Sequence, residues 1–433
     1  MHHDALLSIL AVKQHDVKVT LRSQAFAVTI LFLFLILPSL LRFLLPVSSM
    51  SAGVAVGATS VIFLKLRTLK FSWEYFLSNS ILLLLIGIAA STHFAFAAML
   101  SPVNGSRFVF SLLLALLLIV AAIVVSPVVF GSMHVNGRPE RAIFFILILS
   151  ALFGIVGIQP SGVDVYTKPV FPFTEPSHFA LVFTPILLWM SVTARGVFPY
   201  VYIIFGLIIA VLLQNVTMVV GVILTAAVCL PVFRFLLVSF VMAGAAVALN
   251  SDLSYFSDRI SFASESSNLS ALVYLQGWQL IEESLSNSMG WGLGFQQLGE
   301  NETSVQAALM INAILKTDSN ISDGGFMLVK VVSEFGIFGI VAVAIYFHLF
   351  VASFRRLRHV ALNNIDCPAG KVLALAITVT YVIELLIRGI GYFSGTGFLL
   401  ISAIVYLYSG TSHLQGWKIT PEQQENVAEI KEA

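Results

Sequence analysis

A carboxylate and an imidazole stand directly before a long apolar run in the stretch FTEPSHFALVFTPILLWM, which begins at Phe173. Glu175 and His178 are three residues apart, so they share one face if the segment is helical. A carboxylate beside an imidazole is the arrangement that a general base needs to take a proton from a hydroxyl group. The structural alternative is that Pro176 starts a helix and Glu175 caps it. That alternative leaves His178 unexplained.

A cation and flexible glycines meet in RGIGYFSG, which starts at Arg388. An arginine at a loosened helix end can hold a phosphate through two parallel hydrogen bonds, so Arg388 and the nearby Tyr392 are candidate ligand-binding residues. Glu384 lies one helical turn before Arg388, and simple neutralisation within this pair is the alternative. Lys330 and Glu334 have the same spacing, and for them self-neutralisation is the favoured interpretation.

A long segment between two apolar runs combines a predicted helix with a glycine-rich turn. The helix, LSALVYLQGWQLIEESL over 269–285, carries Trp278 on an apolar face. The turn GWGLGF follows with Trp291, Gly292 and Gly294, and such glycines let backbone N–H groups approach a phosphate or sugar closely. A second helix is predicted over 304–315. The alternative is two interfacial helices that the tryptophans anchor at the membrane surface.

The elements that must position these residues are membrane helices. The chain is 58% hydrophobic and 10% charged, whereas roughly a quarter of the residues in a soluble domain are charged. The sequence therefore predicts an all-α polytopic membrane protein that forms one integral domain over 1–433. Twelve apolar runs are candidates for crossing a hydrocarbon core of roughly 30 Å. They lie near 25–46, 49–65, 75–98, 107–128, 142–158, 178–193, 198–214, 216–231, 235–249, 326–352, 369–389 and 395–409.

Basic residues orient these spans, because Lys and Arg in short loops favour the cytoplasm. With the N-terminus inside, sixteen basic residues fall on the cytoplasmic side, six fall outside, and Lys330 lies within a span. Both termini are therefore predicted to be cytoplasmic. Two outer segments stand out by their length, 159–176 and 250–325, and we expect the functional residues to gather there.

The cysteines and the absence of common sequence motifs narrow the kinds of chemistry that the protein can perform. Cys229 and Cys367 both fall at cytoplasmic depth, so no disulfide is expected. The sequence contains no CxxC, HExxH or P-loop motif. We therefore expect a function without ATP, without a metal or other cofactor, and without a nucleic-acid partner.

Four short motifs together resemble the Wzy-type polymerases of O-antigen and other surface polysaccharides. These motifs are FTEPSHFAL before a span, GWGLGF in the long loop, SEFGIFG in the next span and RGIGYF near the end. The resemblance covers the whole chain in topology. It implies a GT-C-like helical fold in the bacterial inner membrane, with the active site on the periplasmic face.

The resemblance also implies a reaction. A growing glycan would move from undecaprenyl pyrophosphate onto a hydroxyl group at the nonreducing end of a new lipid-linked repeat unit. Arg259 and Arg388 would hold the pyrophosphate, and Glu175 or His178 would deprotonate the acceptor. Asp323, which stands beside Gly324 and Gly325, is a further candidate for substrate binding and the next candidate base. The partners would be undecaprenyl-pyrophosphate-linked oligosaccharides, membrane lipid and a chain-length regulator protein.

Two other functions stay open at this point. An O-antigen ligase, which transfers finished glycan to the lipid A core, shares the glycine-rich motif loosely but generally lacks the EPSHF element. A flippase or secondary transporter of lipid-linked oligosaccharides suits twelve spans. Transporters, however, place their charges at the midplane in broken helices of matched halves, whereas the ionisable residues here cluster near the predicted outer edge.

Overall fold

The computed structural model describes residues 24–44, 50–68, 73–131, 138–158, 170–235, 269–301, 303–316 and 321–409. Within these ranges the chain is helical, and the only β-pairing is an isolated bridge between Val170 and Phe173. Five of the described helices are long and apolar enough to cross a membrane. This architecture agrees with the all-α membrane protein that the composition predicts, whereas the count of twelve spans stays a prediction.

The helices follow the predicted apolar runs. The first run is split into two helices ahead of Pro38, which has no N–H to donate, and the ninth, 235–249, lies almost wholly outside the described residues. The bounds are Gln24–Leu35, α2 Leu37–Leu44, α3 Met50–Thr68, α4 Trp73–Leu100, α5 Gly105–Gly131, α6 Arg138–Val156, α7 Pro176–Thr193, α8 Phe198–Leu212, α9 Val216–Cys229, α12 Leu269–Asn287, α13 Gln306–Leu315, α14 Met327–Leu362, α15 Ala369–Leu386 and α16 Gly395–Ser409.

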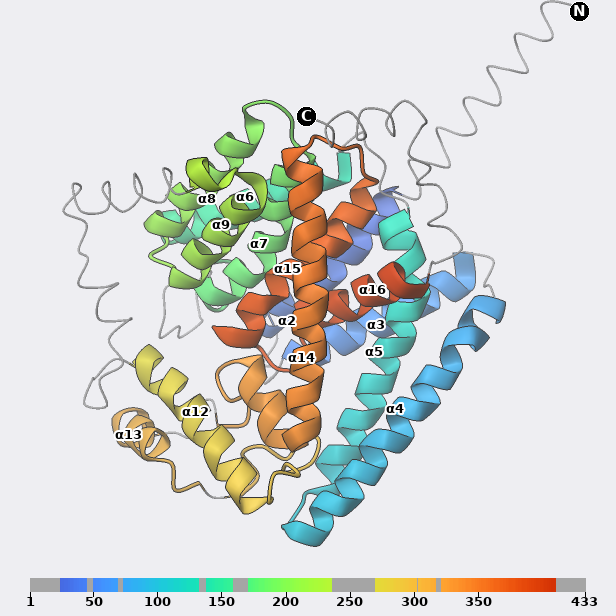
Figure 1. Cartoon of the computed structure of the whole chain (residues 1–433), viewed down its shortest axis with the longest axis vertical. Helices are drawn as coiled ribbons and strands as arrows, with labels where there is room; N and C mark the ends of the chain where they lie inside the picture. The colour runs from blue at the N-terminus through green and yellow to red at the C-terminus, as the bar shows by residue number, and fades with distance from the viewer. Residues whose placement is uncertain are drawn as a thin grey trace, which may run out of the picture.

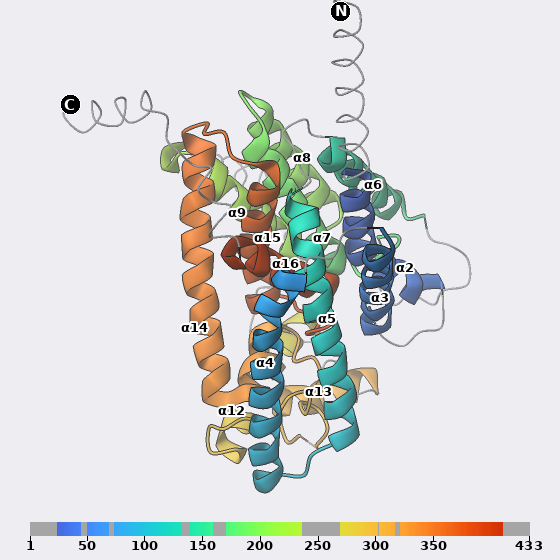
Figure 2. The ribbon, with the colours of Figure 1, turned by 90° about the vertical axis from the view of Figure 1, so that its right-hand side faces the viewer.

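The helices α7 and α15 form the centre of the bundle (Figures 1 and 2). In the apolar stretch of each helix, 83% of α7 and 78% of α15 is buried inside the protein. The corresponding share for α4 is only 11%, so α4 lies at the periphery. The indole N–H of Trp189, near the end of α7, donates to the carbonyl oxygen of Ala369 at the start of α15, at 3.0 Å. The two central helices are therefore antiparallel, so the start of α7 lies beside the end of α15.

A short helical hairpin supports the start of α7. The helices α8 and α9 contain 15 and 14 residues, so each is about 20 Å long at 1.5 Å per residue, less than the roughly 30 Å of a hydrocarbon core. Asn215 caps α9 with its side-chain oxygen, and its Nδ2 donates to the carbonyl oxygen of Pro176 at 2.5 Å. The turn of the hairpin thus fixes the first residue of α7.

The glycine-rich turn packs into a kink of α14. The kink lies at Gly336, whose backbone angles (φ 57°, ψ −129°) are not helical. A Cβ atom on Gly292 would lie 2.5 Å from the carbonyl oxygen of Glu334, so the two backbones approach as closely as glycine allows. GWGLGF and SEFGIFG are therefore in direct contact. Three backbone hydrogen bonds join them, from Leu293 to Ser333 at 2.9 Å, from Gly294 to Glu334 at 2.9 Å and from Ile337 to Gly290 at 3.0 Å.

The long predicted outer loop contains two helices, α12 and α13, which match the predictions over 269–285 and 304–315. They gather at one end of the molecule beside the first turns of α14 and the α4–α5 turn (Figure 1). The α4–α5 turn is tied to the loop, because Gln297 accepts a hydrogen bond from the Asn104 backbone at 2.6 Å and Arg107 pairs with Glu300. The loop, the α4–α5 turn and α14 thus form one packed end of the bundle.

Candidate functional site

The segment FTEPSHF is held in place by its two outer aromatic residues. Phe173 and Phe179 are both completely buried, and their ring centroids lie 5.6 Å apart. This contact brackets the first turn of α7. Pro176 occupies the first helical position, where its missing N–H carries no cost. The polar residues between the two phenylalanines therefore have fixed positions.

Glu175 is the N-cap residue of α7, as predicted, but its side chain does not cap the helix. Its backbone is extended (φ −136°, ψ 145°), as expected of an N-cap residue, but its side chain makes no capping hydrogen bond. The carboxylate instead accepts hydrogen bonds from Arg388 Nη2 at 2.7 Å and from Ser177 Oγ at 3.0 Å, both on Oε2. The capping role is therefore wrong for the Glu175 side chain, which pairs with a residue 213 positions away.

The pairing with Arg388 sets the charge state of Glu175. Burial raises the pKa of this carboxyl group, but the positive charges of Arg388 and His178 and the hydrogen bond from Ser177 outweigh that effect and lower the pKa to about 2. The group is thus a carboxylate at neutral pH. A general base works best with a pKa near the operating pH, so Glu175 is better suited to holding Arg388 than to accepting a proton.

His178 lies beside this ion pair, and neither of its ring nitrogens makes a hydrogen bond within the described part of the chain. The residue is 5% exposed, and Nε2 lies 3.9 Å from Glu175 Oε2, beyond hydrogen-bond distance. Nδ1 is buried and has no hydrogen-bond partner among the described residues. A buried polar atom without a partner costs about 1–3 kcal/mol, so a ligand hydroxyl or a water molecule is favoured there. The imidazole can therefore form a hydrogen bond with a ligand hydroxyl group or a water molecule.

Arg388 is positioned by the loop that follows α15. The next residue, Gly389, donates its N–H to the carbonyl oxygen of Gly325 at 2.9 Å, and a Cβ atom on it would lie 2.8 Å from the nitrogen of Met327. RGIGYF thus packs closely against the start of α14. Of the donor atoms of the guanidinium group, Nη2 is bonded to Glu175. The geometry of an arginine leaves further N–H groups that can reach a phosphate.

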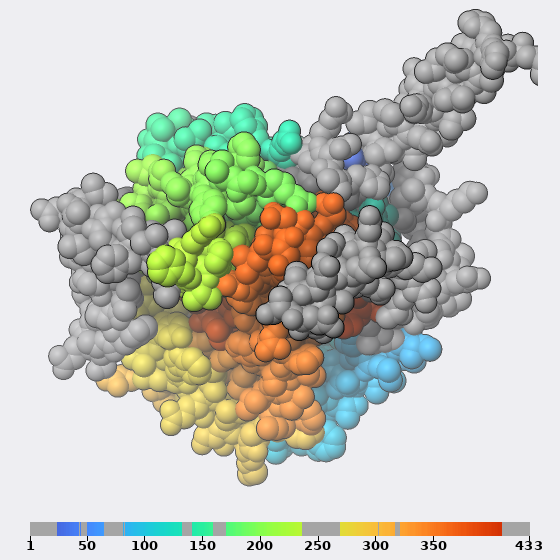
Figure 3. Space-filling view, turned by 45° about the horizontal axis from the view of Figure 1, so that its top comes forward, coloured from blue at the N-terminus to red at the C-terminus, as the bar shows by residue number. Residues whose placement is uncertain are grey.

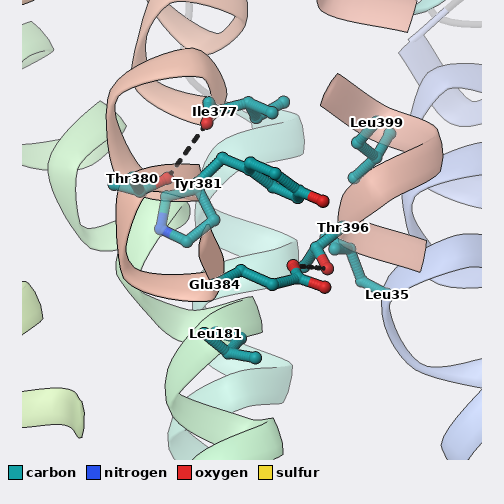
Figure 4. A pocket seen from close by; sticks show the side chains of 9 residues that line it. Leu35, Leu181, Ile377, Thr380, Tyr381, Glu384, Thr396 and Leu399 are labelled. Carbon is teal, nitrogen blue, oxygen red and sulfur yellow. Dashed lines mark hydrogen bonds between the residues drawn. The ribbon is translucent and has the colours of Figure 1, made fainter. Parts of the chain in front are cut away.

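Glu384 is not the partner of Arg388. It is 1% exposed and accepts hydrogen bonds from Ser394 Oγ at 3.0 Å and from Thr396 Oγ1. Figure 4 shows its carboxylate turned toward Thr396, at the edge of a cavity of about 20 Å³. Such a volume is about enough for one water molecule. Neutralisation between Glu384 and Arg388, the alternative drawn from their spacing, is therefore wrong.

Lys330 pairs chiefly with Asp323. Its Nζ donates to the carbonyl oxygen of Ser322 at 2.5 Å and to Asp323 Oδ1 at 3.3 Å, and lies 3.8 Å from Glu334. The side chain of Lys330 is 2% exposed whereas that of Asp323 is 55% exposed. Asp323 thus brings a carboxylate to the surface at this end of the bundle. It is near enough to act electrostatically on His178.

Arg42 is a nearby charge that the sequence reasoning did not connect with His178. It is exposed near the end of α2, and its charge acts on His178 together with those of Glu175 and Arg388. The available signal was its place among the few basic residues predicted to lie outside. The site thus draws charged groups from α2, the start of α7, the end of α15 and the segment before α14.

The remaining predicted residues lie around this centre in other roles. Trp291 stacks on His93 with ring centroids 5.4 Å apart, while Trp278 is 46% exposed on α12.

The N–H of Gly292 donates to Ser288 Oγ at 2.8 Å, and that of Gly294 to the protein backbone, so these glycines serve close packing rather than an open anion cradle. Two further residues complete the predicted set, namely Tyr392, whose ring centroid lies 5.5 Å from Lys330 Nζ, and Arg259, which lies outside the described residues.

A comparison of this chain with family models, with curated proteins and with solved structures finds no match. Within the described ranges, no group of three or more His, Cys, Asp or Glu side chains could hold a metal ion. The geometry at the start of α7 is therefore the feature from which a function can be inferred.

Proposed function

We propose that this protein is a polysaccharide polymerase that joins undecaprenyl-pyrophosphate-linked oligosaccharide repeat units at the periplasmic face of the bacterial inner membrane. The observation that supports it is the Glu175–Arg388 ion pair beside His178, whose ring nitrogens have no hydrogen bond within the described part of the chain. A proton acceptor and an anion-binding cation stand together at the ends of the two most buried candidate spans.

In the proposed reaction, His178 takes the proton of the acceptor hydroxyl group. The freed oxygen forms a bond to the anomeric carbon of the donor glycan, and the bond from that carbon to the pyrophosphate breaks. The electron pair leaves with undecaprenyl pyrophosphate, whose charge Arg388 offsets through its remaining N–H groups. Glu175 holds Arg388 in place, and the resemblance to the Wzy-type polymerases implies Arg259, which lies outside the described residues, as a second cation for the pyrophosphate.

The test compares lipopolysaccharide from a strain that lacks the gene with the same strain carrying wild-type or variant protein. General-base assistance typically contributes about 10²–10⁴-fold in rate. His178→Ala should therefore collapse the polysaccharide ladder on a gel toward single repeat units, with the protein level in the membrane near that of the wild type. His348→Ala is the matched control, because His348 is an exposed histidine on α14 outside the site.

The outcomes separate the candidate functions. Single repeat units on the lipid A core in the deletion strain would support a polymerase. Loss of all surface glycan would instead indicate a ligase or a flippase. A full ladder from His178→Ala at normal abundance would remove His178 from the reaction, and Asp323 would become the next base to test.

A further inference from the structure

A second cavity lies at the end of the bundle opposite the Glu175 site. Its volume is about 320 Å³, within the usual range of ligand pockets. It lies where α6 begins, α7 ends and α14 turns into α15. Figure 3, in which this end of the molecule comes forward, shows the green α7–α9 region beside the orange of α14. Its rim is polar and its inner wall is apolar, with Arg141, Arg195 and Asp366 on the rim and Met190, Val360 and Val372 on the wall.

The charged residues of the rim are two arginines and one aspartate. Arg195 donates to the carbonyl oxygen of Asn364 at 2.6 Å and pairs with Asp366, so its guanidinium group is held across the α14–α15 turn. Arg141 makes no hydrogen bond or ion pair with any residue that the structure describes. Two arginines and one aspartate leave an excess of one positive charge on the lining, which favours an anion.

The cavity lies at the level of the lipid headgroups in the leaflet opposite to the one beside Glu175. The helix α7 runs from Pro176, next to Glu175, to Thr193, which lines the cavity. Its 18 residues correspond to about 27 Å at 1.5 Å per residue, close to the thickness of a hydrocarbon core. An apolar wall below a cationic rim at this level fits an amphiphile with an anionic head. Basic pockets between membrane helices on the cytoplasmic side are suited to anionic lipid headgroups.

We propose that this cavity binds a phosphate group, as carried by the headgroup of an anionic membrane lipid, with Arg141 and Arg195 as its ligands and the acyl chains along the apolar wall. The proposal is independent of the reaction at Glu175 and His178, because the two sites lie at opposite ends of α7. It assigns a binding role to Arg141, which the polymerase reaction does not use.

The proposal is tested with the purified full-length protein in detergent. Mixed micelles that contain phosphatidylglycerol should raise the unfolding temperature of the wild type, and micelles with phosphatidylcholine at the same concentration should raise it less. Arg141→Gln should weaken phosphatidylglycerol binding about tenfold, as expected for the loss of one charge-assisted contact, and Arg141→Lys should restore part of it. Because Arg141 has no partner among the described residues, neither variant should unfold the apo protein.

Arg234→Gln is the matched control. Arg234 is an exposed arginine just after α9 that donates to Tyr200 Oη at 2.6 Å and does not line the cavity. If Arg141→Gln and Arg234→Gln weaken phosphatidylglycerol binding equally, the effect is general surface charge and the proposal fails. Inorganic phosphate tests whether the bound phosphate group comes from a lipid or from a soluble anion. If inorganic phosphate raises the unfolding temperature as much as phosphatidylglycerol does, and this rise depends on Arg141, the phosphate site is upheld and its ligand is a soluble anion. If neither compound raises the unfolding temperature, the site is refuted.

Discussion

The close contact between the glycine-rich turn and the kink of α14 makes a quantitative prediction for the substitution Gly292→Ala. Gly292 has φ +97°, and an added Cβ atom would lie 2.5 Å from both the carbonyl oxygen of Glu334 and the nitrogen of Gly336. These neighbours are backbone atoms, so they cannot rotate away. We therefore expect Gly292→Ala to separate the turn from α14.

The magnitude follows from two contributions. A side chain in a left-handed backbone conformation costs about 1–2 kcal/mol, and overpacking a close contact costs about 1–3 kcal/mol more. Gly292→Ala should thus lower the free energy of unfolding by about 2–5 kcal/mol. Gly290→Ala is the matched control, because Gly290 also has a positive φ (+82°) but its Cβ atom would meet no atom within 4 Å. It should lose only the conformational part, about 1–2 kcal/mol.

The assay is unfolding of the purified protein in mixed micelles by titration with sodium dodecyl sulfate, followed by tryptophan fluorescence. Gly87→Ala in α4 supplies the baseline, because Gly87 has neither a positive φ nor an atom within 4 Å of the added carbon. Equal destabilisation by Gly292→Ala and Gly290→Ala would refute the tight docking of the turn against α14. It would also reopen the possibility that these glycines stand free to bind a ligand.

Further predictions concern topology, the arginine and the ion pair. Alkaline phosphatase fused after Ser288 should be active and a fusion after Arg358 inactive, because the basic residues favour the cytoplasm; the reverse result would invert the orientation. Arg388→Lys should shorten the polysaccharide ladder at normal membrane abundance, since lysine lacks the planar fork, and a full-length ladder would contradict a phosphate-binding role. The pKa of Glu175 is lowered from 4.5 to about 2, so its stabilising effect should be complete above pH 4.5 and lost as the pH falls toward 2. Thermal unfolding of Glu175→Gln and the wild type across this range measures the effect, and a constant difference would contradict it.

The membrane class and most helices were determined by the sequence itself. Long apolar runs must become helices in a bilayer because their backbone groups have no other partners there, and the described helices accordingly follow the predicted runs. The helical spacing of 269–285 and 304–315 likewise predicted α12 and α13. The placement of Glu175 at the N-cap of a helix and of His178 in its first turn also followed from local sequence, because Pro176 starts helices.

The partners of the charged residues were decided only by tertiary structure. Spacing along one helix offered Glu384 as the alternative partner of Arg388. The antiparallel packing of α7 and α15 instead brings Arg388 to Glu175 and leaves Glu384 to Ser394 and Thr396. The glycines of GWGLGF serve a backbone contact with α14 that no local pattern contains. The spacing of apolar residues along the sequence shows which face of a helix is apolar, because that face is formed by residues close together in the chain. Which helices then meet depends on how all the apolar faces pack together, so contacts between residues hundreds of positions apart appear only in the folded molecule.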